Sequence, residues 1–350
     1  MKLGIGLYRH MLTPAHFRFA RQIGCTHVVA HLVNYSSTDN QPVGSERSGW
    51  GAAGDPDAPW TTEELTGLRK HVEAEGLMLE AIENFDPAHW HDVLLDGPKR
   101  DAQMEGLKRL VRSIGKAGIP IMGYNFSIAG VAGRVTGPYA RGGAESVGVE
   151  EVDQTPLPLG MAWNMIYDPR APQGTLPPIS SEELWRRLSR FLHEILPVAE
   201  EAGVVMAAHP DDPPASMVRG TPRLVYQPHL YQKLLDMAPS PSNALEFCLG
   251  TIAEMTEGNV YEATERYSAQ GKLAYVHFRN VRGKVPRYHE VFIDEGDVDM
   301  VRVLEILKKN RYAGVLIPDH TPLVECGAPW HAGMAYAVGY MRAALRVIGD

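Results

Sequence analysis

Cysteine is scarce in this chain, and this scarcity argues against a disulfide-rich secreted protein. Only three cysteines occur among 350 residues, namely Cys25, Cys248 and Cys326, and they are widely separated. An odd number of distant cysteines does not describe the disulfide framework of a small secreted protein. We therefore expect a reducing compartment, in which a cysteine side chain stays free to act as a metal ligand.

The chain also lacks a surplus of positive charge and long hydrophobic runs. It has 34 Lys and Arg against 42 Asp and Glu, a net charge of −8, and no basic block that could follow a phosphate backbone. We therefore expect no nucleic-acid partner. No 18 apolar residues run together, and KLGIGL near Met1 is too short for a signal peptide. We expect no membrane contact and a cytoplasmic location.

Short apolar runs recur along the chain, and turn or helix-start signals bound each of them. Eight runs predict β-strands, at residues 2–7, 26–33, 77–84, 119–125, 204–209, 243–248, 273–278 and 314–319. Several segments between them have helical spacing, open on Ser, Thr or Asp, and close on Gly, as helix caps favour. Strands that alternate with helices imply a parallel sheet, and eight repeats imply that it closes. The sequence thus predicts an α/β fold, a (β/α)₈ TIM barrel.

The length of the chain fits one barrel with insertions. Such a barrel often exceeds its typical ~250 residues, so we predict that residues 1–350 form a single domain. Two connections, 36–60 and 126–180, are rich in Gly and Pro, lack periodicity, and leave from the carboxyl ends of strands. We predict that they are insertions on the catalytic face, either lids, subunit contacts or decoration. We also expect a homo-oligomer.

Four predicted strands in the second half of the chain end on a residue that can bind a transition metal. These residues are His209, Cys248, His277 and Asp319, and their spacings are 39, 29 and 42 residues. Each spacing is close to one strand-plus-helix unit of a barrel, roughly 31 residues. Any one of them alone is more often a core imidazole, a small buried hydrophobe or a helix cap. Because the carboxyl ends of parallel strands meet at one rim, the four together predict a metal site.

The mixture of nitrogen, sulfur and oxygen donors narrows the choice of metal. Mg²⁺ and Ca²⁺ prefer oxygen ligands alone, so this set favours Mn²⁺, Fe²⁺, Co²⁺ or Zn²⁺. A Zn²⁺ ion closed by four protein ligands would be structural. A six-coordinate ion would instead keep two positions open for substrate oxygens. Geometry therefore has to separate a catalytic site from a structural one.

Polar residues near these strand ends are candidates for catalysis and substrate binding. Arg279 has a planar guanidinium that suits a bidentate grip on a carboxylate, and Asn280 follows it. His320 is a candidate for proton transfer, because an ordinary imidazole titrates near neutral pH. Surface ion pairing for Arg279 and a supporting role for His320 are the alternatives. Asp211, close to His209, is a further catalytic candidate. The residues that end strands 2 to 4 and could line the pocket are His31, Asn34, Glu83, Asn84 and Asn125.

The motifs together resemble the mannonate dehydratase family. The matching stretch runs from about Leu184 to Asp319 and includes FLHEILPVAEEAGVVMAAHPDDPP, TPRLV, SPSNALEFCLGT, VHFRNV and EGDVDM, with a looser match in EAEGLMLEAIE and GKAGIPIMGYNF. The resemblance implies a xylose-isomerase-like barrel, a Mn²⁺ or Fe²⁺ ion, and a small sugar acid as the partner. It implies conversion of D-mannonate to 2-keto-3-deoxy-D-gluconate and water. It also places the metal ligands on the four residues that end the strands.

Three segments depart from the pattern of that family. Where the family usually reads Asp-His-Gly, this chain has Asp319, His320 and Thr321. A Pro-Gly-Tyr segment with an active-site tyrosine meets APWHAGMAY at 328–336, and a segment with serine and histidine meets YHEVFIDEGD at 288–297. The departures leave the preferred sugar acid and the proton donor open.

Dehydration of a sugar acid requires removal of the proton on carbon 2 and loss of the hydroxyl on carbon 3. A divalent metal would stabilise the negative charge that builds on the carboxylate, while Arg279 holds the acid and His320 transfers the proton. One alternative is a sugar isomerase or epimerase on the same barrel, although the metal sites of such enzymes usually favour carboxylate ligands. The other is a non-catalytic barrel that binds a sugar acid or holds zinc structurally.

Overall fold

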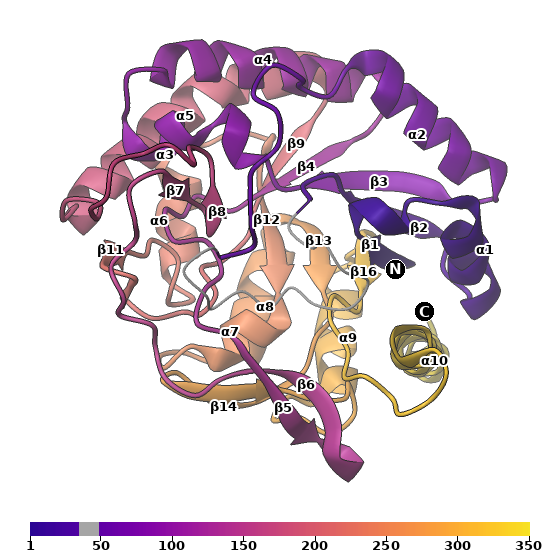
Figure 1. The fold of residues 1–350 in the computed structure, drawn as a ribbon. Helices are drawn as coiled ribbons and strands as arrows, with labels where there is room; N and C mark the ends of the chain where they lie inside the picture. The colour runs from indigo at the N-terminus through magenta and orange to yellow at the C-terminus, as the bar shows by residue number, and fades with distance from the viewer. Residues whose placement is uncertain (35–48) are drawn as a thin grey trace.

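The computed structural model describes residues 1–34 and 49–350, and its centre is a closed barrel of eight parallel strands (Figure 1). Each strand coincides, within two residues at either end, with one that the sequence predicts, so the predicted fold is confirmed. The strands of the barrel are β1 (Lys2–Leu7), β2 (His27–His31), β3 (Met78–Glu83), β4 (Ile121–Tyr124), β9 (Val205–Ala208), β12 (Asn243–Cys248), β13 (Leu273–His277) and β16 (Val315–Ile317).

Helices surround the strands, as Figure 1 shows, and their ends follow from local sequence. Thr61 and Glu64 form a capping box at the start of α2, in which each side chain bonds the other residue's backbone N–H. Helix α5 begins after Ser180 and ends at Gly203, whose left-handed backbone suits glycine. The α-helices are α1 (Pro14–Ile23), α2 (Thr62–Ala74), α3 (His91–Leu95), α4 (Arg100–Lys116), α5 (Ser181–Ala202), α6 (Leu230–Met237), α7 (Leu249–Glu254), α8 (Val260–Ala269), α9 (Met300–Lys309) and α10 (Pro329–Ile348). The short 3-10 helices are η1 (Arg9–Met11), η2 (Pro87–His89) and η3 (Arg141–Gly143).

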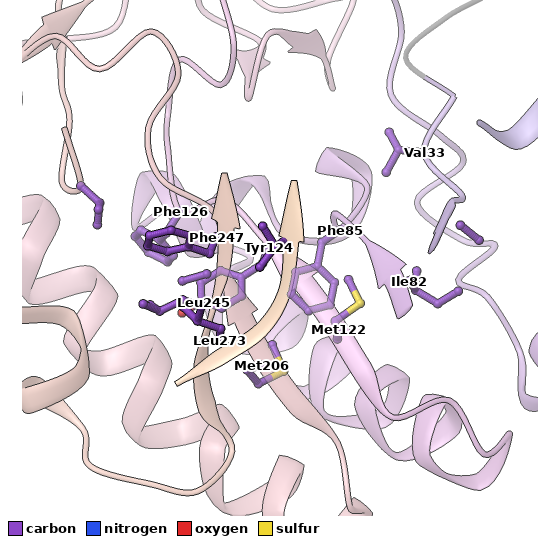
Figure 2. Close-up of a cluster of buried hydrophobic side chains, with 14 of the residues drawn as sticks. Val33, Ile82, Phe85, Met122, Tyr124, Phe126, Met206, Leu245, Phe247 and Leu273 are labelled. Carbon is purple, nitrogen blue, oxygen red and sulfur yellow. The ribbon is translucent and has the colours of Figure 1, made fainter. Parts of the chain in front are cut away.

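Two buried apolar layers hold the barrel together, because successive strand residues point to opposite faces of the sheet. On β9, Met206 packs in the layer between strands and helices, whereas Ala207 belongs to a smaller cluster with residues of other barrel strands. Figure 2 shows part of the outer layer, where Phe126 and Phe247 lie among aliphatic side chains. Truncation of a buried aromatic such as Phe247 to Ala would cost about 3–5 kcal/mol.

The connection after β4 has more structure than its Gly and Pro content indicates. It contains two antiparallel hairpins, and one of them joins the loop after β13 in a four-stranded sheet of order β14-β15-β6-β5. The hairpin strands are β5 (Val135–Ala140), β6 (Ala144–Val149), β7 (Met161–Ala162), β8 (Met165–Ile166), β14 (Val281–Lys284) and β15 (Arg287–Glu290), and a further small pair is β10 (Met217–Val218) with β11 (Thr221–Pro222). The connection after β4 and the loop after β13 are thus hydrogen-bonded to each other through β6 and β15.

The connection after β2 lies only in part within the described residues. Residues 36–48 of the predicted insertion 36–60 fall outside them. In the remainder, the Trp50 N–H donates to the Asn164 carbonyl at 2.8 Å, and Ala52 bridges Ile166. The described end of this connection therefore contacts the insertion after β4. Within 1–34 and 49–350, no helix is both long and apolar enough to cross a bilayer.

Candidate metal centre

The carboxyl ends of β9, β12, β13 and β16 bring the four predicted ligands together. The ligand atoms of His209, Cys248 and His277 all lie within 4.8 Å of one another. Asp319 joins them, since its Oδ2 lies 3.4 Å from His277 Nδ1. Asp319 has a φ of 62°, a left-handed conformation that Asp tolerates better than most residues. The strand-end spacing in the sequence therefore corresponds to one cluster in space.

Hydrogen bonds fix which nitrogen of each histidine faces this cluster. His209 Nδ1 lies 2.6 Å from the Pro210 carbonyl, to which it can donate, and this leaves Nε2 for the cluster. His277 Nε2 bonds Glu83 Oε2 at 3.2 Å. Its Nδ1 is buried and has no hydrogen-bond partner among the described residues. Metal-ligating histidines usually donate their second N–H to a carboxylate or carbonyl in this way.

The sulfur and oxygen donors are held in their anionic forms. Burial opposes ionisation of Cys248, but the charge of Arg279 and the neighbouring imidazoles of His209 and His277 hold the pKa of the thiol well below its ordinary value. Burial likewise opposes ionisation of Asp319, while His320 and His277 lower the pKa of that carboxyl. Thiolate and carboxylate are the forms that bind metal. The donor set, with an orphaned His277 nitrogen facing it, fits a divalent transition metal.

Glu246, a residue that the sequence analysis did not select, lies directly beside the cluster. It is fully buried on β12, and its Oε1 is 3.2 Å from His277 Nε2. Neither carboxylate oxygen has a hydrogen-bond partner among the described residues. Glu246 precedes Cys248 by two residues, so strand alternation places both side chains on one face. The signal in the sequence was an acidic residue inside the apolar run NALEFC.

The two buried carboxylates beside His277 have opposite pKa shifts. Burial and the charge of Glu83 raise the pKa of Glu246 to about 8. For Glu83, burial acts in the same sense, but His31 and His277 outweigh it and lower the pKa to about 2. At neutral pH Glu83 is therefore ionised and Glu246 is protonated. Glu83 also accepts from the Tyr275 hydroxyl at 3.2 Å.

A cavity lined mainly by polar side chains opens above the cluster. Five of the predicted site residues outside the ligand set line it, namely His31, Glu83, Asn84, Asn125 and His320. Asn125 is fixed by bonds to the Pro210 carbonyl and the Trp163 indole, at 3.2 Å each. Two tryptophans that the sequence analysis did not select, Trp50 and Trp163, also line the cavity, with ring centroids 5.1 Å apart at 71°. Carbohydrate-sized ligands would meet both polar groups and aromatic faces here.

His320 is held in the manner of an oriented acid–base group. Its Nδ1 lies 3.1 Å and 3.0 Å from the two carboxylate oxygens of Glu290, while its Nε2 lies 3.5 Å from Asp319 Oδ1. A carboxylate on one imidazole nitrogen fixes the ring and the tautomer, and leaves the other nitrogen for proton transfer. Glu290 ends β15, a strand that the sequence analysis did not predict.

Arg279 does not line the cavity, although the sequence analysis expected it to grip a substrate carboxylate. It is buried behind the ligands, where its Nη2 lies 3.1 Å from Asp212 Oδ2, 3.2 Å from Glu254 Oε1 and 3.5 Å from Cys248 Sγ. Its Nη1 bonds Glu290. Because protein groups occupy these donors, the position favours a role in holding the thiolate rather than the substrate.

Asn280 and Asp211 also lie outside the cavity lining, because each is used to shape a loop. The Asn280 amide donates to the Ile293 and Val298 carbonyls, at 2.9 Å each. Asp211 accepts from the backbone N–H groups of Leu224 and Val225, at 2.8 Å each. Neither arrangement favours the substrate-binding and catalytic roles that the sequence analysis gave to these two residues.

A family model and curated relatives match most of this chain. The family model described as D-mannonate dehydratase (UxuA) matches residues 21–137 and 149–343. The chain is 30% identical over 295 residues to mannonate dehydratase 2 of Halalkalibacterium halodurans, a match that covers 80% of this chain and 85% of that protein. It is 32% identical over 277 residues to a mannonate dehydratase of Streptococcus suis, covering 75% of this chain and 74% of that protein.

Solved structures give the same result for the fold. The crystal structure of mannonate dehydratase from Streptococcus suis serotype 2 superposes with a TM-score of 0.77 at 26% identity, covering 100% of this chain and 95% of that one. A D-psicose 3-epimerase from Clostridium cellulolyticum H10 superposes with a TM-score of 0.56 at 12% identity, covering 99% of this chain and 98% of that one. The second likeness concerns the barrel alone.

Proposed function

The chain belongs to the D-mannonate dehydratase family, and we propose that it is a hydro-lyase that converts D-mannonate to 2-keto-3-deoxy-D-gluconate and water. The observation that carries the proposal is the convergence of His209, Cys248, His277 and Asp319 beneath a polar cavity. Mixed donors of this kind suit Mn²⁺ or Fe²⁺, and Co²⁺ or Zn²⁺ are also compatible with them. When bound, the ion would act as a Lewis acid on the oxygens of the sugar acid.

We assign proton transfer to His320. In the reaction the bond from carbon 2 to hydrogen breaks, the hydroxyl on carbon 3 leaves as water once protonated, and the resulting enol becomes the 2-keto acid. The group that moves these protons must face the cavity and keep a fixed orientation. His320 lines the cavity, and Glu290 holds its Nδ1. Its Nε2 is then the atom that exchanges the proton.

The other predicted residues divide into two sets in this proposal. His31 and Asn125 line the cavity and would contact hydroxyl groups of the sugar acid. Glu83 would keep the His277 ring in place through the bond to Nε2. Arg279 would keep Cys248 as a thiolate, since its charge lies next to the sulfur. Asp211 would support the loop after β9.

The proposal treats the chain as one barrel domain with insertions after β2 and β4. The homo-oligomer and the cytoplasmic location that the sequence analysis expects stay predictions.

The experiment that tests the function is a product assay. Protein purified without oxygen is loaded with Mn²⁺ or with Fe²⁺ and incubated with D-mannonate and with other aldonic acids. We expect a 2-keto-3-deoxy acid from D-mannonate, and no product from metal-free protein. An isomer of unchanged mass would replace the proposal with isomerisation. Product from another aldonic acid alone would keep the dehydratase chemistry but change the substrate.

A further inference from the structure

The insertion after β4 places an arginine at the mouth of the barrel. Arg134 directly precedes β5, is buried, and lines the cavity above the candidate ligands. Within the described part of the chain, it is the one guanidinium among the lining residues. No sequence pattern predicts a role for Arg134, because it lies in a connection without a recognisable motif.

Arg134 is held by a carboxylate that is itself anchored. Its Nη2 donates to Asp212 Oδ2 at 2.7 Å. Asp212 also accepts from the Tyr288 hydroxyl at 2.7 Å and from Arg279 Nη2 at 3.1 Å. This network fixes the guanidinium before a ligand arrives. The Nε of Arg134 is buried and has no hydrogen-bond partner among the described residues, so the planar fork keeps donor capacity.

The carboxylates around the cavity favour a cationic group that can face an anionic substrate. Three carboxylates, Glu83, Asp212 and Asp319, line the space that an anionic sugar acid must enter. Like charges close together in a buried site repel strongly. Arg279 is less suited to this role, since it does not line the cavity and both of its Nη atoms are bonded to protein groups.

We infer that Arg134 binds the carboxylate of the substrate and is the positioning group that selects an acid over an uncharged sugar. The inference rests on the proposed function for the identity of the substrate, but it goes beyond that function by assigning the acid group to a residue of the insertion. A planar guanidinium presents paired donors that match the two oxygens of a carboxylate.

The test compares Arg134→Gln and Arg134→Lys with the Mn²⁺-loaded wild type. Initial rates with D-mannonate give kcat and KM, and inhibition by D-mannitol gives the affinity for a polyol without a carboxylate. The matched control is Arg141→Gln, which removes an exposed arginine of the same insertion that pairs with Asp294 at 2.9 Å. Asp212 keeps its bonds to Arg279 and Tyr288 in the Arg134 variants, so we expect them to fold and to bind the metal.

We expect Arg134→Gln to raise KM for D-mannonate by ~10- to 100-fold, the equivalent of a lost hydrogen bond to a charged group. Arg134→Lys should lie between this variant and the wild type, and inhibition by D-mannitol should be unchanged in both. Arg141→Gln should match the wild type throughout. An unchanged KM in Arg134→Gln overturns the inference, and so does an equal loss of D-mannitol inhibition, which would assign Arg134 to a hydroxyl group.

The failure of the proposed function would be separately visible. In that case the wild type gives no product from D-mannonate, and direct calorimetric binding of D-mannonate to the same variants replaces the kinetics. Weaker binding in Arg134→Gln than in Arg141→Gln would then still support a carboxylate site at Arg134. Equal binding in the two variants would overturn it.

Discussion

Glu83 and Glu246, the two carboxyl groups beside His277, can be substituted one at a time to distinguish the ionised group from the protonated one. Glu83 and Glu246 both lie 3.2 Å from His277 Nε2, but only Glu83 makes a hydrogen bond with it. Glutamine has the size of glutamic acid and no charge. Glu83→Gln therefore removes a negative charge that the fold uses, whereas Glu246→Gln imitates the protonated state already present at neutral pH.

The expected magnitudes follow from these two states. A hydrogen bond to a charged group contributes about 1.5–3 kcal/mol and a neutral one about 0.5–1.5 kcal/mol. Loss of a carboxylate behind a ligating histidine typically weakens metal binding by about 10- to 100-fold. Because glutamine keeps a neutral hydrogen bond, the difference here, about 1–1.5 kcal/mol, corresponds to roughly 5- to 10-fold. We expect that range for Glu83→Gln. A carboxyl with a pKa of about 8 is mostly protonated at pH 7, so Glu246→Gln should change metal affinity by less than about threefold.

The assay is a competition titration of each metal-free variant with Mn²⁺ and with Zn²⁺ against a chromophoric chelator at neutral pH. A weaker affinity in Glu246→Gln than in Glu83→Gln, or an equal loss in both, would refute the assignment of charges.

The dependence of the free energy of unfolding on pH gives an independent check. The folded-state pKa of Glu246, about 8, lies above the ordinary 4.5. Its protonated form therefore favours folding at low pH, and this contribution is lost as pH rises through about 8. The Glu246→Gln variant should therefore gain stability over the wild type as the pH rises from the ordinary value of 4.5 to about 8.

Three further predictions concern the proton-transfer group, the thiolate and the buried ion network. His320→Asn should keep its metal and lower kcat by ~10²-fold or more; near-wild-type turnover would remove His320 from the mechanism. Cys248→Ser should lose at least ~10-fold in metal affinity, since a hydroxyl replaces a soft thiolate, and peroxide should inactivate the wild type unless metal protects the sulfur. Asp212→Asn should lower the free energy of unfolding by about 3–5 kcal/mol, because buried arginines lose their counter-charge, as measured by urea unfolding. The exposed control Asp294→Asn should change it by less than about 1 kcal/mol, and similar losses in the two would contradict the buried network.

The barrel was predictable because its signals are local. Each barrel strand is a short apolar run, and each run ends where a turn or helix begins, as at Cys248 before α7. The convergence of the four candidate ligands followed from the same pattern, since parallel strands deliver their last residues to one rim. Alternation along a strand was a further signal that was not used. It places Glu246 with Cys248, and Tyr275 with His277, on shared faces.

The rest of the site depends on pairing between distant segments, which local patterns do not reveal. Strand β6 pairs with β15, so that Val149 lies opposite Tyr288 although 139 positions separate them. Neither strand has the continuous apolar run of a barrel strand. The position of Arg279 away from the cavity was unpredictable for a related reason. A guanidinium next to a strand end looks available in the sequence, but the carboxylates that occupy it come from other elements, among them Asp212 and Glu254.

The added sheet connects substrate positioning with proton transfer. Arg134, which we infer to bind the carboxylate, directly precedes β5, and Glu290, which orients His320, ends β15 of the same sheet. Their side chains meet, since Arg134 Nη2 lies 3.6 Å from Glu290 Oε1. A shift of this sheet would therefore move the acid group of the substrate and the imidazole together, while the metal ligands stay on the barrel strands. Changes in the insertion should for this reason alter which sugar acid reacts without altering which metal binds.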